Sequence, residues 1–195
     1  MKRDKNKGIL FWITGLSGSG KTTLGKAIHK DIQKLYGPTI MISGDNIRNI
    51  FYLKGYNKKE RLKILKSYCQ FAKYITNQKI NIIFAVVGMF HEPRNWNKRH
   101  IKNYLEIYIK SNLKKIIKLN KKKIYHKKNI KNIIGIDIKP EFPKKPDITI
   151  INLFNKPIKK IAVDIIKKIK KILIKDFFKI KKQFISIYRN FLDNF

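Results

Sequence analysis

Short apolar runs alternate with longer segments of helical period along the chain. Strands are predicted where apolar residues are continuous, because strands buried on both faces of a parallel sheet show little alternation. These patterns place strands at Ile9 to Ile13, Thr39 to Ile42, Ile80 to Val87, Tyr104 to Ile109 and Ile148 to Ile151, and helices at Thr23 to Tyr36, Asn46 to Phe51, Lys58 to Asn77, Asn112 to Leu119 and from Pro157 onwards. The alternation indicates one α/β domain with a mainly parallel sheet.

The first strand-to-helix turn carries a glycine-rich motif. Gly15 to Thr22 fits G-x-x-x-x-G-K-[ST], and it stands between the first predicted strand and the first predicted helix, as a phosphate-binding loop requires. Glycines let backbone N–H groups approach a phosphate, and the helix N-terminus favours negative charge. The motif predicts a nucleoside triphosphate site formed by Gly15, Ser17, Gly18, Ser19, Gly20, Lys21, Thr22 and Thr23.

Two residues of this motif have predicted roles in the chemistry. Lys21 is expected to reach the β and γ phosphates, and the Thr22 hydroxyl to ligate Mg²⁺. The motif in this context predicts a three-layer fold of the P-loop nucleoside triphosphate hydrolase type, with ATP as the ligand.

A second polar cluster follows the second predicted strand. Asp45 lies at the carboxyl end of that strand, where ligands bind in doubly wound α/β proteins. Arg48 follows and offers a guanidinium fork to a second phosphate-like group. The alternative for Asp45 is a plain helix cap, a role that Asp often fills.

Two further stretches carry candidate functional residues. Residues 88–100 follow a strand end and carry His91 and His100, and they are expected either to contact substrate or to pack within the protein. A metal site at these two histidines is only weakly indicated, because no third ligand accompanies them. Residues 120–146 are long and irregular, which is typical of a functional lid. The phosphate-loop domain is expected to span residues 1–175, and residues 176–195 are expected to form a tail to which no role is assigned.

Composition narrows the function classes. The 195 residues hold 46 Lys and Arg against 12 Asp and Glu, a formal net charge of +34, but the lysines are spread over the whole chain rather than clustered. Nucleic acid is therefore not expected as a specific partner. The last predicted helix is apolar on one face and lysine-rich on the other, and it is expected to cover the sheet rather than to bind a membrane. Cys69 is the only cysteine and no apolar segment is long enough to span a bilayer, which favours a cytoplasmic protein.

The sequence resembles the adenylyl-sulfate kinase family from about Leu10 to Asp147. The resemblance rests on the phosphate loop together with Gly44-Asp45-Asn46-Ile47-Arg48, Gly55-Tyr56 with Arg61, Glu106-Ile107-Tyr108-Ile109, Ile130-Lys131-Asn132, Gly135-Ile136-Asp137, Glu141, Pro143 and Pro146-Asp147. It implies an ATP-dependent kinase acting on the 3′-hydroxyl of adenylyl sulfate, and a homodimer.

The resemblance also assigns roles to residues of this chain. It implies that Asp45 and Lys21 are the catalytic residues, with Asp45 as the general base. It further implies a set of substrate contacts, which comprises Arg48, Tyr56, Arg61, Ile107, Lys131 and Asn132. Tyr56 stands where the family stacks an aromatic ring on the base.

Four departures from the family pattern are expected to lie on the acceptor side. They are Ser43 in place of Asp, Ile64-Leu65-Lys66-Ser67 in place of Asn-Ile-Arg-Arg, Val86 to His91 in place of Phe-Ile-Ser-Pro-(Phe/Tyr)-Arg, and Ile133 in place of the lid phenylalanine. The ATP side is unaltered, so kinase activity with adenylyl sulfate is the first expectation. A related kinase acting on another nucleotide, such as cytidine diphosphoramidate in capsule modification, is the first alternative, and a basic nucleotide-binding adaptor without catalysis is the second.

Overall fold

The computed structural model describes residues 4–119, 125, 131–158 and 160–174. A five-stranded sheet forms its centre, with the order β2-β3-β1-β4-β5 and every neighbouring pair parallel. The strands are β1 (Leu10–Gly15), β2 (Thr39–Ser43), β3 (Asn81–Val86), β4 (Tyr104–Lys110) and β5 (Ile148–Ile151). Each of the five predicted strands is thus confirmed within a residue or two of its expected ends.

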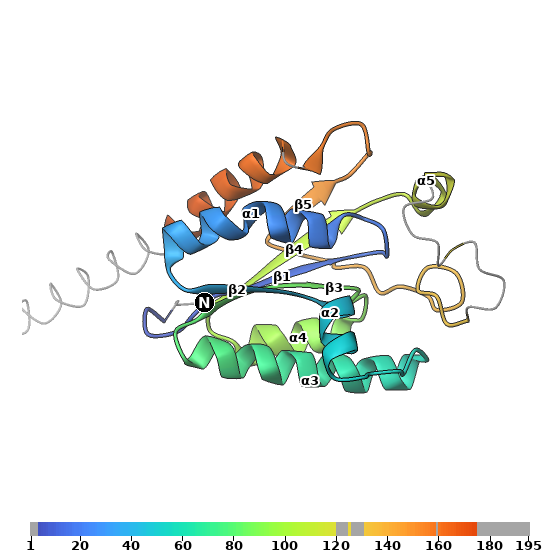
Figure 1. Ribbon diagram of the computed structural model, residues 1–195, viewed down its shortest axis with the longest axis horizontal. Helices are drawn as coiled ribbons and strands as arrows, with labels where there is room; N and C mark the ends of the chain where they lie inside the picture. Colours follow the sequence, from blue (N-terminus) through green and yellow to red (C-terminus); the bar gives the residue numbers. More distant parts are fainter. Residues whose placement is uncertain (1–3, 120–124, 126–130, 159, 175–195) are drawn as a thin grey trace, which may run out of the picture.

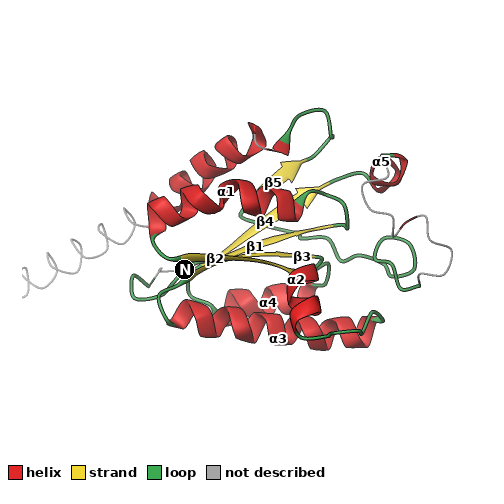
Figure 2. Ribbon diagram, in the orientation of Figure 1, coloured by secondary structure: helices red, strands yellow, loops and turns green. Residues whose placement is uncertain are grey.

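Helices cover both faces of the sheet. They are α1 (Lys21–Tyr36), α2 (Gly44–Ile50), α3 (Lys58–Asn77), α4 (His91–His100) and α5 (Leu113–Lys118), and residues 158 and 160–174 are also helical. Helix α1 and the helix at 160–174 lie over one face, and α3 and α4 lie over the other (Figure 1). Figure 2 shows the resulting helix, sheet and helix layers. The predicted three-layer α/β fold is confirmed.

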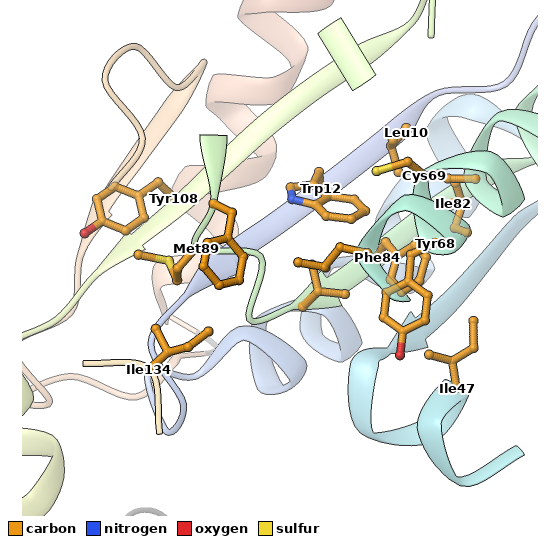
Figure 3. Close-up of a cluster of buried hydrophobic side chains, with 14 of the residues drawn as sticks. Leu10, Trp12, Ile47, Tyr68, Cys69, Ile82, Phe84, Met89, Tyr108 and Ile134 are labelled. Carbon is orange, nitrogen blue, oxygen red and sulfur yellow. The ribbon is translucent and has the colours of Figure 1, made fainter. Parts of the chain in front are cut away.

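The layers are joined by two apolar clusters. Phe11, Ile13 and Leu105 pack against α1 and the helix at 160–174, whereas Trp12 and Phe84 pack against α3 and α4. All six residues of β1 and of β3 are buried, because helices cover both faces of the sheet centre. Figure 3 shows the second cluster, in which the rings of Trp12 and Phe84 lie 5.3 Å apart between centroids.

Local signals fix where the helices begin. Gly20 precedes α1 with φ of 98°, a left-handed conformation that favours glycine. Asn57 and Glu60 form a capping box at α3, since the Asn57 side chain accepts from the Glu60 N–H and the Glu60 carboxylate accepts from the Asn57 N–H. Both helices therefore start immediately after the loops that border the site.

Candidate active site

The phosphate loop lies at the carboxyl end of β1 and is fixed by bonds to its own carbonyl groups. The Asn152 amide donates to the Ser19 carbonyl at 3.0 Å, the Tyr125 hydroxyl to the Ser17 carbonyl at 2.9 Å, and the Lys21 ammonium to the Leu16 carbonyl at 2.8 Å. These bonds give three loop carbonyl oxygens donors within the protein, so the carbonyls are satisfied without a ligand. They tie the loop to Tyr125 and to the segment after β5.

The Lys21 side chain makes a contact that the sequence does not predict. The residue is only 7% exposed, and its ammonium donates to the Leu16 carbonyl of the loop itself. The stem is buried because α1 packs directly on the sheet, so the ammonium reaches the cavity from within the loop.

A cavity of about 590 Å³ opens beside the loop. This volume falls in the usual range for a nucleotide-sized ligand. Its walls come from the phosphate loop, the start of α2 and the segment after β5, and they include Ser17, Gly18, Gly20, Lys21, Thr22, Thr23, Ser43, Gly44, Asp45, Asn152, Phe154 and Pro157. Of the predicted nucleotide contacts, Gly15 and Ser19 do not line this cavity. Both are buried because the loop packs on β4 and β5 there.

The segment after β5 is a part of the site that sequence reasoning missed. The residues of this segment that line the larger cavity together with the phosphate loop are Asn152, Phe154, Asn155, Lys156 and Pro157. The only signal is a polar residue at a strand end, and Asn152 fits it, since it is 4% exposed and comes directly after Ile151.

A smaller cavity of about 190 Å³ adjoins the first one. The two share Ser17, Gly44, Asp45 and Val87, so they meet at the start of α2. The remaining walls of the smaller cavity are largely apolar, with two arginines and two tyrosines, namely Arg48, Tyr56, Arg61, Ile64, Leu65, Tyr68, Val86, Ile133 and Ile134.

Asp45 lies at the junction of the two cavities, in the first turn of α2. The residue that caps α2 is Ser43, whose hydroxyl accepts from the Asn46 N–H at 3.2 Å. The plain helix-cap interpretation of Asp45 is therefore wrong. The exposed Asp45 carboxylate can instead serve a ligand that crosses between the cavities.

Two arginines and one tyrosine form the charged end of the smaller cavity. The guanidinium carbons of Arg48 and Arg61 lie 4.6 and 5.3 Å from the centroid of the Tyr56 ring. Arg61 also donates to the carbonyls of Tyr56 at 2.6 Å and of Asn132 at 3.0 Å. Burial and the nearby Arg48 charge lower the pKa of Arg61. Two cations held this close favour an anionic ligand.

The structure does not bring every predicted substrate residue to the site. Ile107 is fully buried in the apolar cluster that contains β4 and α1, so the predicted substrate contact at Ile107 is wrong. Lys131 is exposed and lines neither cavity. Asn132 is held through its backbone, since its carbonyl accepts from Arg61, and its side chain lines neither cavity.

The departures from the family pattern are also divided between the cavities. Ile64, Leu65, Val86 and Ile133 line the smaller one, as expected for the acceptor side. Val87 lines both cavities, and Ser43 lines only the larger one. The expectation fails for Ser43 and for the departures that line neither cavity, namely Lys66, Ser67, Gly88, Met89, Phe90 and His91.

Residues 88–100 have a structural role rather than a place in the cleft. Arg94 is 2% exposed and donates to the carbonyls of Gly88 at 2.8 Å and Glu141 at 2.7 Å, and its Nε lies 3.0 Å from the Glu106 carboxylate. Burial raises the pKa of Glu106, although Lys98 and Arg94 oppose this shift. The ion pair joins α4 to β4.

The weakly indicated metal site at the two histidines is not supported. His91 bonds to Arg94 and His100 to the Trp96 carbonyl. Within the described part of the chain, no three His, Cys, Asp or Glu residues are grouped so that they could hold a metal ion. Nor does any described helix have the length and apolar character needed to cross a membrane.

A phosphate loop at the end of β1, a nucleotide-sized cavity and an adjoining cationic cavity define a phosphotransferase of the P-loop kinase class. Comparison with known proteins identifies the family. The family model described as adenylylsulphate kinase matches residues 7–151. The chain belongs to the adenylylsulphate kinase family.

Individual relatives differ in the substrate that their names give. The cytidine diphosphoramidate kinase of Campylobacter jejuni is 34% identical over 121 residues, which are 62% of this chain and 71% of that enzyme. The probable adenylyl-sulfate kinase of Aeropyrum pernix is 32% identical over 124 residues, 61% of this chain and 68% of that protein. The APS kinase of Mycobacterium tuberculosis, solved with AMPPNP and APS, has the same fold, with a TM-score of 0.75 at 21% identity over 84% of this chain and 98% of that one.

Proposed function

We propose that this protein transfers the γ-phosphoryl group of ATP to the 3′-hydroxyl of an acceptor nucleotide that carries an anionic terminal group. The observation that carries the proposal is the junction of the two cavities at Ser17, Gly44, Asp45 and Val87. A triphosphate on the loop and an acceptor in the smaller cavity would meet there, and phosphoryl transfer mainly requires such alignment.

The residues at the junction fit the roles that the family resemblance implies. Asp45 would accept the proton of the attacking hydroxyl as its oxygen bonds to the γ-phosphorus, while the bond from that phosphorus to the β–γ bridging oxygen breaks and ADP leaves. Lys21 would neutralise charge on the phosphates. Arg48 and Arg61 would bind the anionic terminal group of the acceptor.

The Thr22 hydroxyl is the protein oxygen that would hold Mg²⁺. It lines the larger cavity at the first turn of α1, and Mg²⁺ commonly takes only one or two protein oxygens and completes its shell with phosphates and water. When bound, the ion would neutralise negative charge on the phosphates.

Two acceptors are proposed. Adenylyl sulfate follows from the family and from the relatives named for it. Cytidine diphosphoramidate is favoured by the C. jejuni relative and by Ile133, an apolar side chain without a ring, on the wall of the smaller cavity. Sulfate activation or capsule modification would be the corresponding process.

An acceptor screen with labelled ATP and Mg²⁺ tests the proposal. Label should pass to at least one of the two nucleotides, and failure with both, and with related nucleotides, would support the alternative of an adaptor without catalysis. Asp45→Asn tests the mechanism: turnover should fall about 10²- to 10⁴-fold with ATP affinity nearly unchanged, the usual effect of losing a general base. Asp31→Asn, on an exposed position of α1, is the matched control. Normal turnover in Asp45→Asn would refute the assigned role.

A further inference from the structure

Tyr68 carries a buried hydroxyl that has no hydrogen-bond partner in the described part of the chain. The residue lies on α3 and is 4% exposed, and its ring packs on Phe84 with 5.2 Å between centroids. Among the residues that the structure describes, none forms a hydrogen bond with this hydroxyl. An unpaired buried hydroxyl destabilises a fold, so its presence calls for an explanation.

Tyr68 borders the smaller cavity, in which the acceptor is proposed to bind. Tyr68 lines the smaller cavity, and Figure 3 shows its oxygen pointing toward α2, beside Ile47. Three other residues of that cavity, Arg48, Asp45 and Tyr56, are the groups whose charge acts on it. Burial raises the pKa of Tyr68 to about 12, so the hydroxyl stays neutral at physiological pH.

A neutral hydroxyl among apolar walls suits a neutral polar group of a ligand. Ile64, Leu65 and Val86 line the cavity with Tyr68, whereas the arginines provide the sites for anionic groups. The part of an acceptor nucleotide that is flat, largely apolar and edged with hydrogen-bonding atoms is its base.

We propose that Tyr68 is a specificity-determining residue whose hydroxyl hydrogen-bonds to the polar edge of the acceptor's base. This inference rests on the proposed function, because it places an acceptor nucleotide in the smaller cavity. A site with a buried hydroxyl discriminates strongly against a ligand that leaves this hydroxyl unpaired.

Tyr68→Phe tests the inference because it removes one oxygen atom and keeps the ring. In steady-state assays the variant should lose roughly 5- to 100-fold in kcat/KM for the acceptor, as expected when a polar ligand atom is left unpaired. The loss should appear mainly in the acceptor KM, with the KM for ATP unchanged. The melting temperature should equal or exceed that of the wild type, since no protein bond is lost.

Tyr104→Phe is the matched control. Its hydroxyl is also buried without a hydrogen-bond partner in the described residues, but Tyr104 lines neither of the two cavities. This variant should keep wild-type kinetics with both substrates.

The possible results separate the inference from the proposed function. If the wild type transfers phosphate to no nucleotide, the proposed function is wrong and the role of Tyr68 falls with it. If the wild type is active and Tyr68→Phe has an unchanged acceptor KM, only the inference is overturned. Inhibition by AMP or CMP, which lack the terminal group, should weaken in Tyr68→Phe; unchanged inhibition would place the hydroxyl at the terminal group and would also overturn it.

Discussion

Removal of the Asn152 side chain tests whether the end of β5 holds the phosphate loop in place. Asn152 donates to the Ser19 carbonyl at 3.0 Å and accepts from the Phe154 N–H at 3.0 Å. It thereby links the phosphate loop to the segment after β5, and both line the larger cavity. The bond to Ser19 spans 133 residues of sequence. We expect Asn152→Ala to weaken both the fold and the binding of ATP.

The size of both effects follows from these two bonds. Losing the bond from the Phe154 N–H costs about 0.5–1.5 kcal/mol, and leaving the Ser19 carbonyl unpaired costs about 1–3 kcal/mol, so the free energy of unfolding should fall by about 1.5–4.5 kcal/mol. For a domain of this size that lowers the melting temperature by roughly 3–18 °C. If one loop residue becomes free, ATP must order it again at a cost of about 1–2 kcal/mol, which weakens binding about 5- to 30-fold.

Thermal unfolding and calorimetric titration with a non-hydrolysable ATP analogue measure the two effects separately. Asn155→Ala is the matched control, since Asn155 lines the same cavity but is exposed. It should change the melting temperature little. If Asn152→Ala has the melting temperature and analogue affinity of the wild type, the loop does not depend on β5 and the reasoning is wrong.

Two further predictions concern Lys21 and the buried Tyr68. Lys21→Ala should lower turnover on the order of 10³-fold or more, because one positioned cation is lost at the transferring phosphoryl group. The control variant Lys26→Ala, at an exposed position of α1, should keep normal turnover. Near-normal turnover in Lys21→Ala would contradict the phosphate-loop assignment. Burial raises the pKa of Tyr68 to about 12, above the ordinary value of 10.0, so the unfolded chain loses this proton first and the contribution of Tyr68 to stability falls as pH rises from 10 toward 12. Urea unfolding should therefore show Tyr68→Phe gaining stability relative to the wild type over that range, and a constant difference would refute the shift.

Features that depend on neighbouring residues were predicted well from the sequence. The phosphate loop, the strand before it and the helix after it are each set by a short segment, and Lys21, Thr22 and Asp45 line the cavities that the motifs predict. Continuous apolar runs indicated strands buried on both faces, as the structure confirms for β1 and β3.

Features that depend on distant parts of the chain could not be predicted. Ile107 follows Glu106 and precedes Tyr108 on β4, and adjacent side chains on a strand point to opposite faces. Because both faces of the sheet are covered, an apolar run does not reveal which face meets the site. The contacts of Asn152 with Ser19 and of Arg94 with Glu106 likewise form only once the strand order is set.

Substitution of Ile133 tests which acceptor the smaller cavity prefers. The residue is 6% exposed and lines the cavity, and its backbone is fixed because its N–H donates to the Asp137 carboxylate at 2.7 Å. A larger residue at this position must therefore extend into the cavity, where the acceptor's base is proposed to lie, or disturb its packed neighbours.

We expect Ile133→Phe to shift the acceptor preference toward adenylyl sulfate and away from cytidine diphosphoramidate. Stacking on an aromatic ring contributes roughly 1–3 kcal/mol per base, so the ratio of the two kcat/KM values should rise about 5- to 100-fold. Overpacking, at roughly 1–3 kcal/mol, would lower the melting temperature but would affect both acceptors alike. Ile136→Phe, on the same turn but 53% exposed and outside both cavities, should leave the ratio unchanged. An unchanged ratio in Ile133→Phe would show that the base does not lie against this residue, and the acceptor would then have to occupy the cavity in another orientation.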